Sequence, residues 1–173
     1  ALLRAKELAS KGVELFASPA LKFFLYNDIN RERFKSDPKC LENFILLDDN
    51  DIWTALKVWC NHNDIILATL SQGMVNREIF KVEVSPTPCT EERLNAISER
   101  IAKQLHINKE DTRYFISTPS IEKNMYNPAD DSIDILYNDG STTNIAEASD
   151  MLHLSVLSKK VKKYYICYLR EKK

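Results

Sequence analysis

Two basic residues are spaced so that their side chains could bind an anion together. The segment Asn76-Arg77-Glu78-Ile79-Phe80-Lys81 stands where a helical pattern gives way to an alternating one. Residues four apart in a strand point to the same face, so Arg77 and Lys81 would project together, about 13 Å apart along the backbone. Two cations at such a helix-to-strand junction can hold a phosphate group. The alternative is that both are solvent-facing charges on an edge strand.

The other residue types that commonly do chemistry form no recognisable active site. The three histidines belong to no H-E-x-x-H or H-x-x-x-H pattern, and we expect them at helix ends or on the surface. No Gly-x-Ser-x-Gly elbow occurs, and no cysteine has the setting of a nucleophile. The sequence therefore predicts no catalytic residue and no metal ligand in this chain. The histidines are His62, His106 and His153.

Acidic residues cluster at two places. Asp48, Asp49 and Asp51 come directly before an apolar stripe with helical spacing, which favours helix capping over a metal site. The pair Asp130-Asp131 follows Asn127-Pro128, which is typical of a solvated turn. Both clusters are therefore expected to be structural.

Composition and charge limit the class of protein. The chain has 173 residues, 44% of them hydrophobic, and a formal net charge of -1, so it has no general attraction for nucleic acid or anionic membrane. Only three glycines occur, which argues against a glycine-rich phosphate loop. No apolar run approaches the roughly 20 residues that span a bilayer. We expect a cytoplasmic protein without membrane contact, cut from a longer chain because Ala1 stands inside a helical pattern.

The four cysteines occur without any C-x-x-C pair, so neither a zinc ribbon nor a thioredoxin-type site is indicated. A chain of this length needs no disulfide staples, and no secretion signal is visible. We expect four reduced thiols, mostly buried. They are Cys40, Cys60, Cys89 and Cys167.

The first part of the chain reads as helical. Helices are predicted over 1–17 and 20–29, with a polar loop over 30–38. A helix capped by Asp48 or Asp49 should bury Ile52, Ala55, Leu56 and Trp59, and another should run from Asn63 or Asp64 to Gly73 as its C′ residue.

The second part mixes strands and helices. Strands are predicted over 79–84 and 113–117, separated by a helix that Thr90 caps. A hairpin should pair 133–137 with 142–146 across Asn138-Asp139-Gly140. A helix over 148–157 and a central strand over 164–169 complete the order. The fold class is α+β: a helical part, 1–73, followed by an α+β domain, 74–173, with a small antiparallel sheet and two helices in near ferredoxin-like order.

Two segments of the chain resemble motifs that occur in the same order in one protein family. The segment 47–53, Leu-Asp-Asp-Asn-Asp-Ile-Trp, and the segment 76–81 resemble an L-[TD]-D-N helix start and an R-N-L-F-K strand start. Both motifs follow the catalytic core in HD-domain phosphohydrolases, above all in deoxynucleoside triphosphate triphosphohydrolases of the SAM- and HD-domain dNTPase type. The later order is also similar, with Asn127-Pro128-x-Asp130, a hairpin and a closing strand that contains Tyr168. The resemblance spans about residues 40–171.

This resemblance implies that the chain is the C-terminal structural or regulatory part of a metal-dependent phosphohydrolase. The parent would hydrolyse dNTPs to deoxynucleoside and triphosphate, with a divalent metal held by an upstream H…H-D…D set, while this part alone would be inactive and hold no cofactor. Regulated members bind a nucleotide phosphate through basic residues of the R-N-L-F-K segment, which Arg77 and Lys81 match. Glu78 and Ile79 replace that family's Asn and Leu. The implied partners are the protein's own HD catalytic part, further copies of itself and a (deoxy)nucleotide.

Two other classes of function stay open on the residues alone. The chain could be a stand-alone α+β module that binds nucleic acid through its basic C-terminal tail, or a purely structural dimerisation domain. A run of lysines interleaved with a buried-looking strand is more often only solvated. The lysines concerned are Lys159, Lys160, Lys162 and Lys163.

Overall fold

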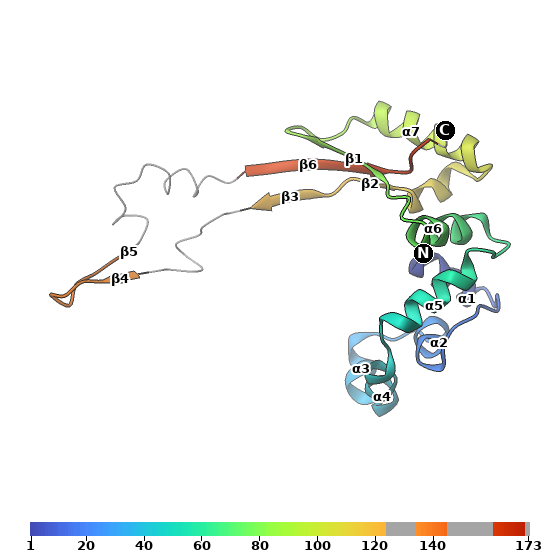
Figure 1. Ribbon diagram of the computed structural model, residues 1–173, viewed down its shortest axis with the longest axis horizontal. Helices are drawn as coiled ribbons and strands as arrows, with labels where there is room; N and C mark the ends of the chain where they lie inside the picture. The colour runs from blue at the N-terminus through green and yellow to red at the C-terminus, as the bar shows by residue number, and fades with distance from the viewer. Residues whose placement is uncertain (124–133, 145–160, 172–173) are drawn as a thin grey trace. The chain divides into compact units, whose positions relative to one another are not determined.

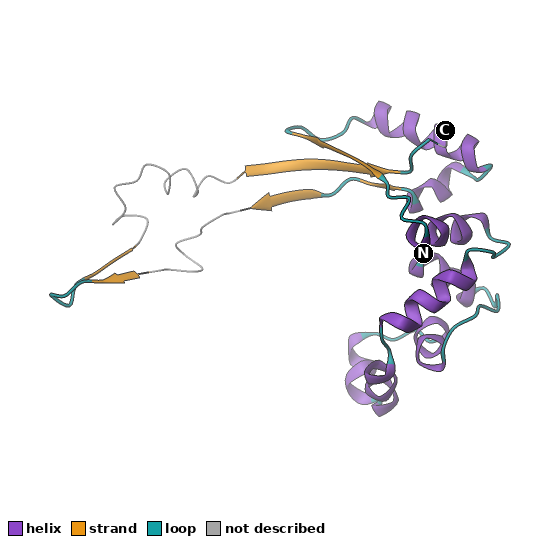
Figure 2. Ribbon diagram, viewed as in Figure 1, coloured by secondary structure: helices purple, strands orange, loops and turns teal. Residues whose placement is uncertain are grey.

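A computed structural model describes residues 1–123, 134–144 and 161–171 of the chain (Figure 1). The chain forms two compact units. The first comprises residues 1–81, 97–116 and 168–173, and the second comprises residues 82–96 and 117–167. The fold class is α+β with a helical N-terminal part, as predicted (Figure 2). The predicted domain boundary after residue 73 stays a prediction.

The N-terminal part of the first unit is a succession of short helices. They are α1 (Leu2–Ser10), α2 (Pro19–Tyr26), α3 (Arg31–Ser36), α4 (Pro38–Leu46), α5 (Asp49–Trp59) and α6 (Ile65–Val75). The predicted caps of the last two are confirmed. Asp48 and Asp51 form a capping box at α5, and the Asp64 carboxylate accepts a hydrogen bond from the backbone N–H of Leu67 in α6. The hydrogen bonds that the Asp48 carboxylate accepts from the backbone N–H of Asp51 and from the side chain and backbone N–H of Asn50 hold the pKa of Asp48 below its usual range.

The predicted loop over 30–38 is wrong. The Asn30 side chain accepts a hydrogen bond from the backbone N–H of Arg33 and begins α3. Asp37 then caps α4, and Pro38 is its first residue, where proline is tolerated because that position has no intrahelical N–H bond. The polar residues and the proline that suggested a loop are therefore two helix starts, and α4 was not predicted.

Helix α1 ends earlier than its apolar pattern suggested. It was expected to continue to residue 17, but Gly12 adopts a φ of 81° just after Ser10. The backbone N–H of Gly12 donates to the Ala9 carbonyl and that of Val13 donates to the Leu8 carbonyl, which is a Schellman motif with Gly12 in the left-handed position.

The core of the helical part is apolar and continuous. Its buried side chains come from α1, the segment after it, α2, α5 and α6. Trp59, which is 1% exposed, packs in this core and donates its indole N–H to the Phe16 carbonyl at 3.0 Å. The predicted apolar stripe of α5 is confirmed at Ala55, Leu56 and Trp59, whereas Ile52 is only half-buried.

One ion pair joins the first helix to the last helix of this core. The Arg4 guanidinium in α1 donates to the Asp64 carboxylate, with its Nη2 2.6 Å from Oδ2 and its Nε 3.1 Å from Oδ1. Burial raises the pKa of Asp64, but the hydrogen bonds from Arg4 and from the Leu67 N–H outweigh it, so this pKa lies below its ordinary value. The hydrogen bond to Asp64 raises the pKa of Arg4. Asp64 thus serves as both an ion-pair partner and a helix cap.

The sheet is built around the last described strand. Strand β6 (Val161–Tyr168) lies between β1 (Lys81–Ser85) and β2 (Ile116–Ser117), and it also pairs with β3 (Ser120–Lys123). The central position predicted for the closing strand is confirmed. Strand β3 runs antiparallel to β6, with Ser120 opposite Tyr164. Helix α7 (Glu91–Leu105) connects β1 to a 3-10 turn, η1 (Lys109–Tyr114). Of the strand predicted over 113–117, the first two residues belong to η1 and the last two form β2.

The predicted hairpin is confirmed. Strands β4 (Asp134–Leu136) and β5 (Thr142–Asn144) pair antiparallel, with Ile135 opposite Thr143. Gly140 has a φ of 83° in the connection, which explains why a glycine stands there. The predicted helix over 148–157, the turn at Asp130-Asp131 and the lysines at 159–160 lie outside the described residues.

No helix in the described ranges is long and apolar enough to cross a membrane. The four cysteines are free thiols, as expected, but Cys40 alone is buried and the other three are half-exposed.

Because Arg4 and Asp64 have side chains only 12% and 16% exposed, we predict that Arg4→Met lowers the free energy of unfolding by about 2 kcal/mol at neutral pH. The matched variant Lys109→Met breaks an exposed pair with Glu99 and should cost under about 0.5 kcal/mol. The pKa of Asp64 is lower in the folded chain than its unfolded value, near 3.8. Ionised Asp64 therefore stabilises the fold fully at pH values above 3.8, and this stabilisation is lost as the pH falls through the folded pKa. Urea unfolding at pH 7 and pH 3 should therefore show the Arg4 effect shrinking in acid. Equal effects of the two variants would contradict this account.

Candidate functional site

The candidate site begins at the C-terminal end of α6. The helix was predicted to stop at Gly73, but it continues to Val75. Arg77 then adopts a left-handed φ of 58°. The backbone N–H of Glu78 donates to the Gly73 carbonyl at 2.9 Å, and the N–H of Arg77 donates to the Met74 carbonyl at 3.4 Å. This is the same Schellman motif that ends α1, with an arginine where α1 has a glycine.

The position of Arg77 corrects one expectation about the basic pair. Arg77 and Lys81 were expected on one face of a single strand. Strand β1 begins only at Lys81, because the backbone of residues 76–78 completes the helix end. Strand parity therefore does not relate the two side chains. Each instead lines one of two adjoining cavities.

The cavity at Arg77 has a volume of about 520 Å³ and lies within the first unit. The last turns of α6 form one wall, and the chain between α6 and β1 forms another. The remaining wall comes from Gln104 of α7 and from the residues that follow β6. The lining residues are Thr69, Gln72, Gly73, Arg77, Glu78, Ile79, Phe80, Gln104, Leu169, Arg170 and Glu171.

The cavity at Lys81 has a volume of about 420 Å³ and shares Arg170 and Glu171 with the first. Its floor is Tyr168, whose side chain is buried. The Lys81 Nζ lies 5.6 Å from the centroid of the Tyr168 ring, and the Arg100 Cζ lies at the same distance from it. Both cations therefore lie within cation–π distance of the same phenol ring.

Hydrogen bonds fix one cationic group of this cavity, the Arg100 guanidinium. The Arg100 Nη2 donates to the Leu169 carbonyl at 2.7 Å, and its Nε lies 3.6 Å from the Glu171 carboxylate. Gln104 accepts from Arg100 and donates to the Arg170 carbonyl. The segment after β6 is thereby fastened to α7.

The charges around the two cavities favour an anion. Among the described residues, the lining contains the cations Arg77, Lys81, Arg100 and Arg170 and the acids Glu78 and Glu171. Guanidinium and ammonium groups converging on one surface are the usual partners of phosphate. Sequence reasoning missed Arg100 and Arg170, because they come from α7 and the end of β6 and no local pattern connects them to Arg77.

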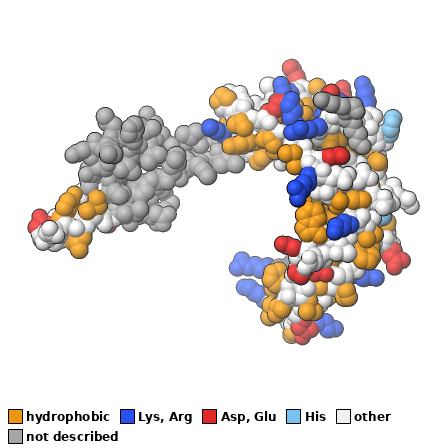
Figure 3. Space-filling view, in the orientation of Figure 1, with side chains coloured by type: hydrophobic (Ala, Val, Ile, Leu, Met, Phe, Trp, Pro, Cys, Tyr) orange, Lys and Arg blue, Asp and Glu red, His pale blue; other side chains and the backbone are white. Residues whose placement is uncertain are grey.

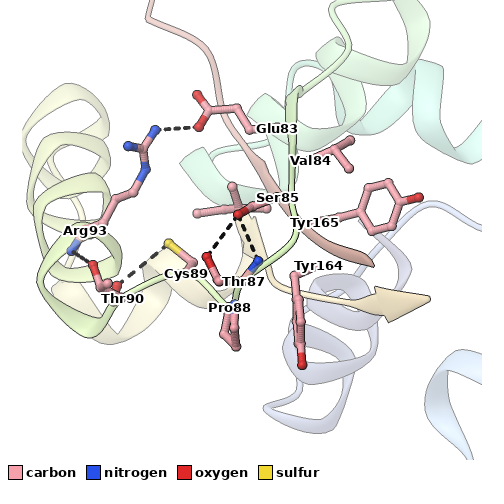
Figure 4. Close-up of a pocket in the computed structure, with 11 residues that line it drawn as sticks. Glu83, Val84, Ser85, Thr87, Pro88, Cys89, Thr90, Arg93, Tyr164 and Tyr165 are labelled. Atoms are coloured by element: carbon pink, nitrogen blue, oxygen red, sulfur yellow. Dashed lines mark hydrogen bonds and ion pairs between the residues drawn. The ribbon is translucent and has the colours of Figure 1, made fainter. Parts of the chain in front are cut away.

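A third cavity, of about 330 Å³, lies in the second unit (Figure 4). Its polar groups are already bonded to one another. Arg93 forms an ion pair with Glu83, and Ser85 Oγ accepts from the backbone N–H of Thr87 and lies 3.2 Å from the Thr87 hydroxyl. Arg93, the one cation among the described residues that line it, is therefore neutralised, which makes this cavity a weaker candidate for an anion.

The two histidines in the described ranges lie at helix ends. The His62 Nδ1 accepts a hydrogen bond from the backbone N–H of Asp64 at 2.9 Å, just before α6. His106 adopts a left-handed φ of 53° just after α7. Both positions agree with the predicted placement at helix ends. His153 lies outside the described residues. Within the described ranges, no group of three or more histidine, cysteine or acidic side chains is placed to hold a metal ion.

The chain is similar in sequence and fold to part of a phosphohydrolase from Bacteroides thetaiotaomicron whose crystal structure is known. The two are 69% identical over 97% of this chain, with a TM-score of 0.91. The chain spans 42% of the length of that protein's chain. No protein-family model matches the sequence, and no curated protein matches it.

The left-handed backbone conformation of Arg77 should lower the stability of the chain. We expect Arg77→Gly to raise the free energy of unfolding by about 1 kcal/mol relative to Arg77→Ala, because a left-handed residue with a Cβ is disfavoured. Gly12→Ala is the reciprocal control, since Gly12 fills the same position in α1 and an added Cβ there meets nothing within 4 Å. It should cost about 1 kcal/mol in urea unfolding. Equal stability of the two Arg77 variants would mean that the left-handed conformation is not retained.

Proposed function

We propose that the chain is a non-catalytic C-terminal part of an HD-type, metal-dependent phosphohydrolase. The observation that carries the proposal is its 69% identity, over 97% of its length, to part of a phosphohydrolase. Because the chain spans 42% of that protein, the proposal places catalysis in a part of the larger protein that this chain does not include. The motifs at residues 47–53 and 76–81 support the HD type and a deoxynucleoside triphosphate substrate.

Within that protein, the cavities at Arg77 and Lys81 would bind the phosphates of a nucleotide. Among the described residues, four cations line these two adjoining cavities, which supports this role. The conformation of Arg77 supports it further, because a helix end that would be more stable with glycine carries a long cationic side chain instead. The acids Glu78 and Glu171 reduce the positive charge, so we expect moderate affinity; it should fall as salt is added, because the remaining attraction is electrostatic.

The activity is tested on the natural full-length protein. With Mg²⁺ or Mn²⁺ we expect it to convert a dNTP and water to deoxynucleoside and inorganic triphosphate in one step. Water would attack the α-phosphorus, its bond to the 5′-oxygen would break, and the deoxynucleoside would leave with the proton on that oxygen. Removal of the metal by a chelator should abolish the reaction. The 173-residue chain alone should show no turnover. Release of single phosphates, or turnover by the short chain after removal of contaminating phosphatases, would contradict the proposal.

The phosphate site is tested by binding. Arg77→Ala and Lys81→Ala should each weaken binding of dGTP to the catalytically inactivated full-length protein by about tenfold or more, since each removes a charge-assisted hydrogen bond. Lys22→Ala removes an equal charge from the exposed surface of α2 and should leave affinity within about twofold. Titration calorimetry at two salt concentrations measures the dGTP affinity of each variant and its salt dependence. Equal losses for all three variants would indicate only a general charge effect.

A further inference from the structure

Helix α4 has an apolar face that the described residues leave largely uncovered. Leu41, Phe44 and Ile45 are 52%, 56% and 71% exposed. Their i, i+3, i+4 spacing places them on one side of the helix. Apolar side chains gather at the surface over α3 and α4 in Figure 3.

The neighbouring side of the same helix is already used. Cys40, one turn before Phe44, is fully buried, and Leu47, just after the helix, packs against the core. The Phe44 ring also meets the Phe34 ring edge-on at 5.7 Å, so part of its surface packs against α3. The apolar surface of α4 is therefore wider than the part that the described residues cover, which is typical of a helix that packs on more than one side.

We propose that this face of α4, formed by Leu41, Phe44 and Ile45, is where another segment of the same polypeptide packs in the larger protein. The inference rests on the proposed function, which makes this chain part of a longer phosphohydrolase. More than half of the similar phosphohydrolase has no counterpart in this chain, whereas 97% of this chain, including nearly all its helical part, is matched there.

The size of the face favours a connected segment over a separate partner. Helix α4 has nine residues and is about 14 Å long, and its exposed apolar stripe is short. A stable complex between separate chains typically buries about 800 Å² on each partner, which three side chains do not supply. A segment joined through the backbone loses far less freedom on packing, so a small apolar face is sufficient to hold it. A second copy of the chain is therefore the weaker occupant.

The occupant can be identified by photo-crosslinking in the natural full-length protein. Benzoylphenylalanine replaces Ile45 in one variant and Leu136 in a control, since Leu136 is 70% exposed on β4. We expect position 45 to crosslink, at the mass of a single chain, to a residue outside the 173-residue sequence, and position 136 to give no such product. A crosslink between two copies, or no crosslink at position 45, would overturn the proposal.

A second pair of variants measures the energetic effect. In the full-length protein, Ile45→Lys should lower the midpoint of thermal unfolding by about 5 °C or more, and Leu136→Lys by less than about 2 °C. Equal shifts would count against a covered α4 face. Both readouts are independent of catalysis, so a protein that hydrolyses no dNTP but crosslinks as expected would refute the proposed activity and leave this inference intact.

Discussion

The ion pair between Arg4 and Asp64 is the constraint on which the first unit depends. It joins two helices that are 60 residues apart in the chain, and Asp64 also caps α6. The position of α6 in turn determines the candidate site, because its C-terminal turn holds Arg77 in a left-handed conformation. A stabilising interaction at one end of a helix thus positions a strained residue at the other end. The charged pair and the cationic cavities are linked by eleven residues of helix.

The sequence predicted those elements whose signals are local. Asp48, Asp64 and the Asn138-Asp139-Gly140 turn each act through hydrogen bonds within a few residues, and all three predictions are confirmed. The errors arise where one local signal fits two structures. Pro38 is compatible with a loop and also with the first residue of a helix, and it begins α4. Gly73 is compatible with a helix end and also with a helix interior, and α6 continues past it.

The site was predictable only in part, because residues far apart in the chain line it. Arg77 and Lys81 are close in sequence and could be singled out as a pair, although for the wrong geometric reason. Arg100 and Arg170 join them through folding, since Arg100 bonds the Leu169 carbonyl and so brings the end of β6 to α7. The resemblance of the motifs suggested a phosphohydrolase, and the similarity to a phosphohydrolase supports that class more firmly than any single motif. The substrate and the regulatory role remain proposals.

The central claim is that these cavities bind a nucleotide that acts on catalysis performed elsewhere in the protein. The most direct test measures the rate of dNTP hydrolysis by the full-length protein against nucleotide concentration, in the natural form and in Arg77→Ala/Lys81→Ala. The account predicts that the double variant retains metal-dependent hydrolysis but loses the part of the rate that rises with a second bound nucleotide. Superimposable curves for the two proteins would contradict it.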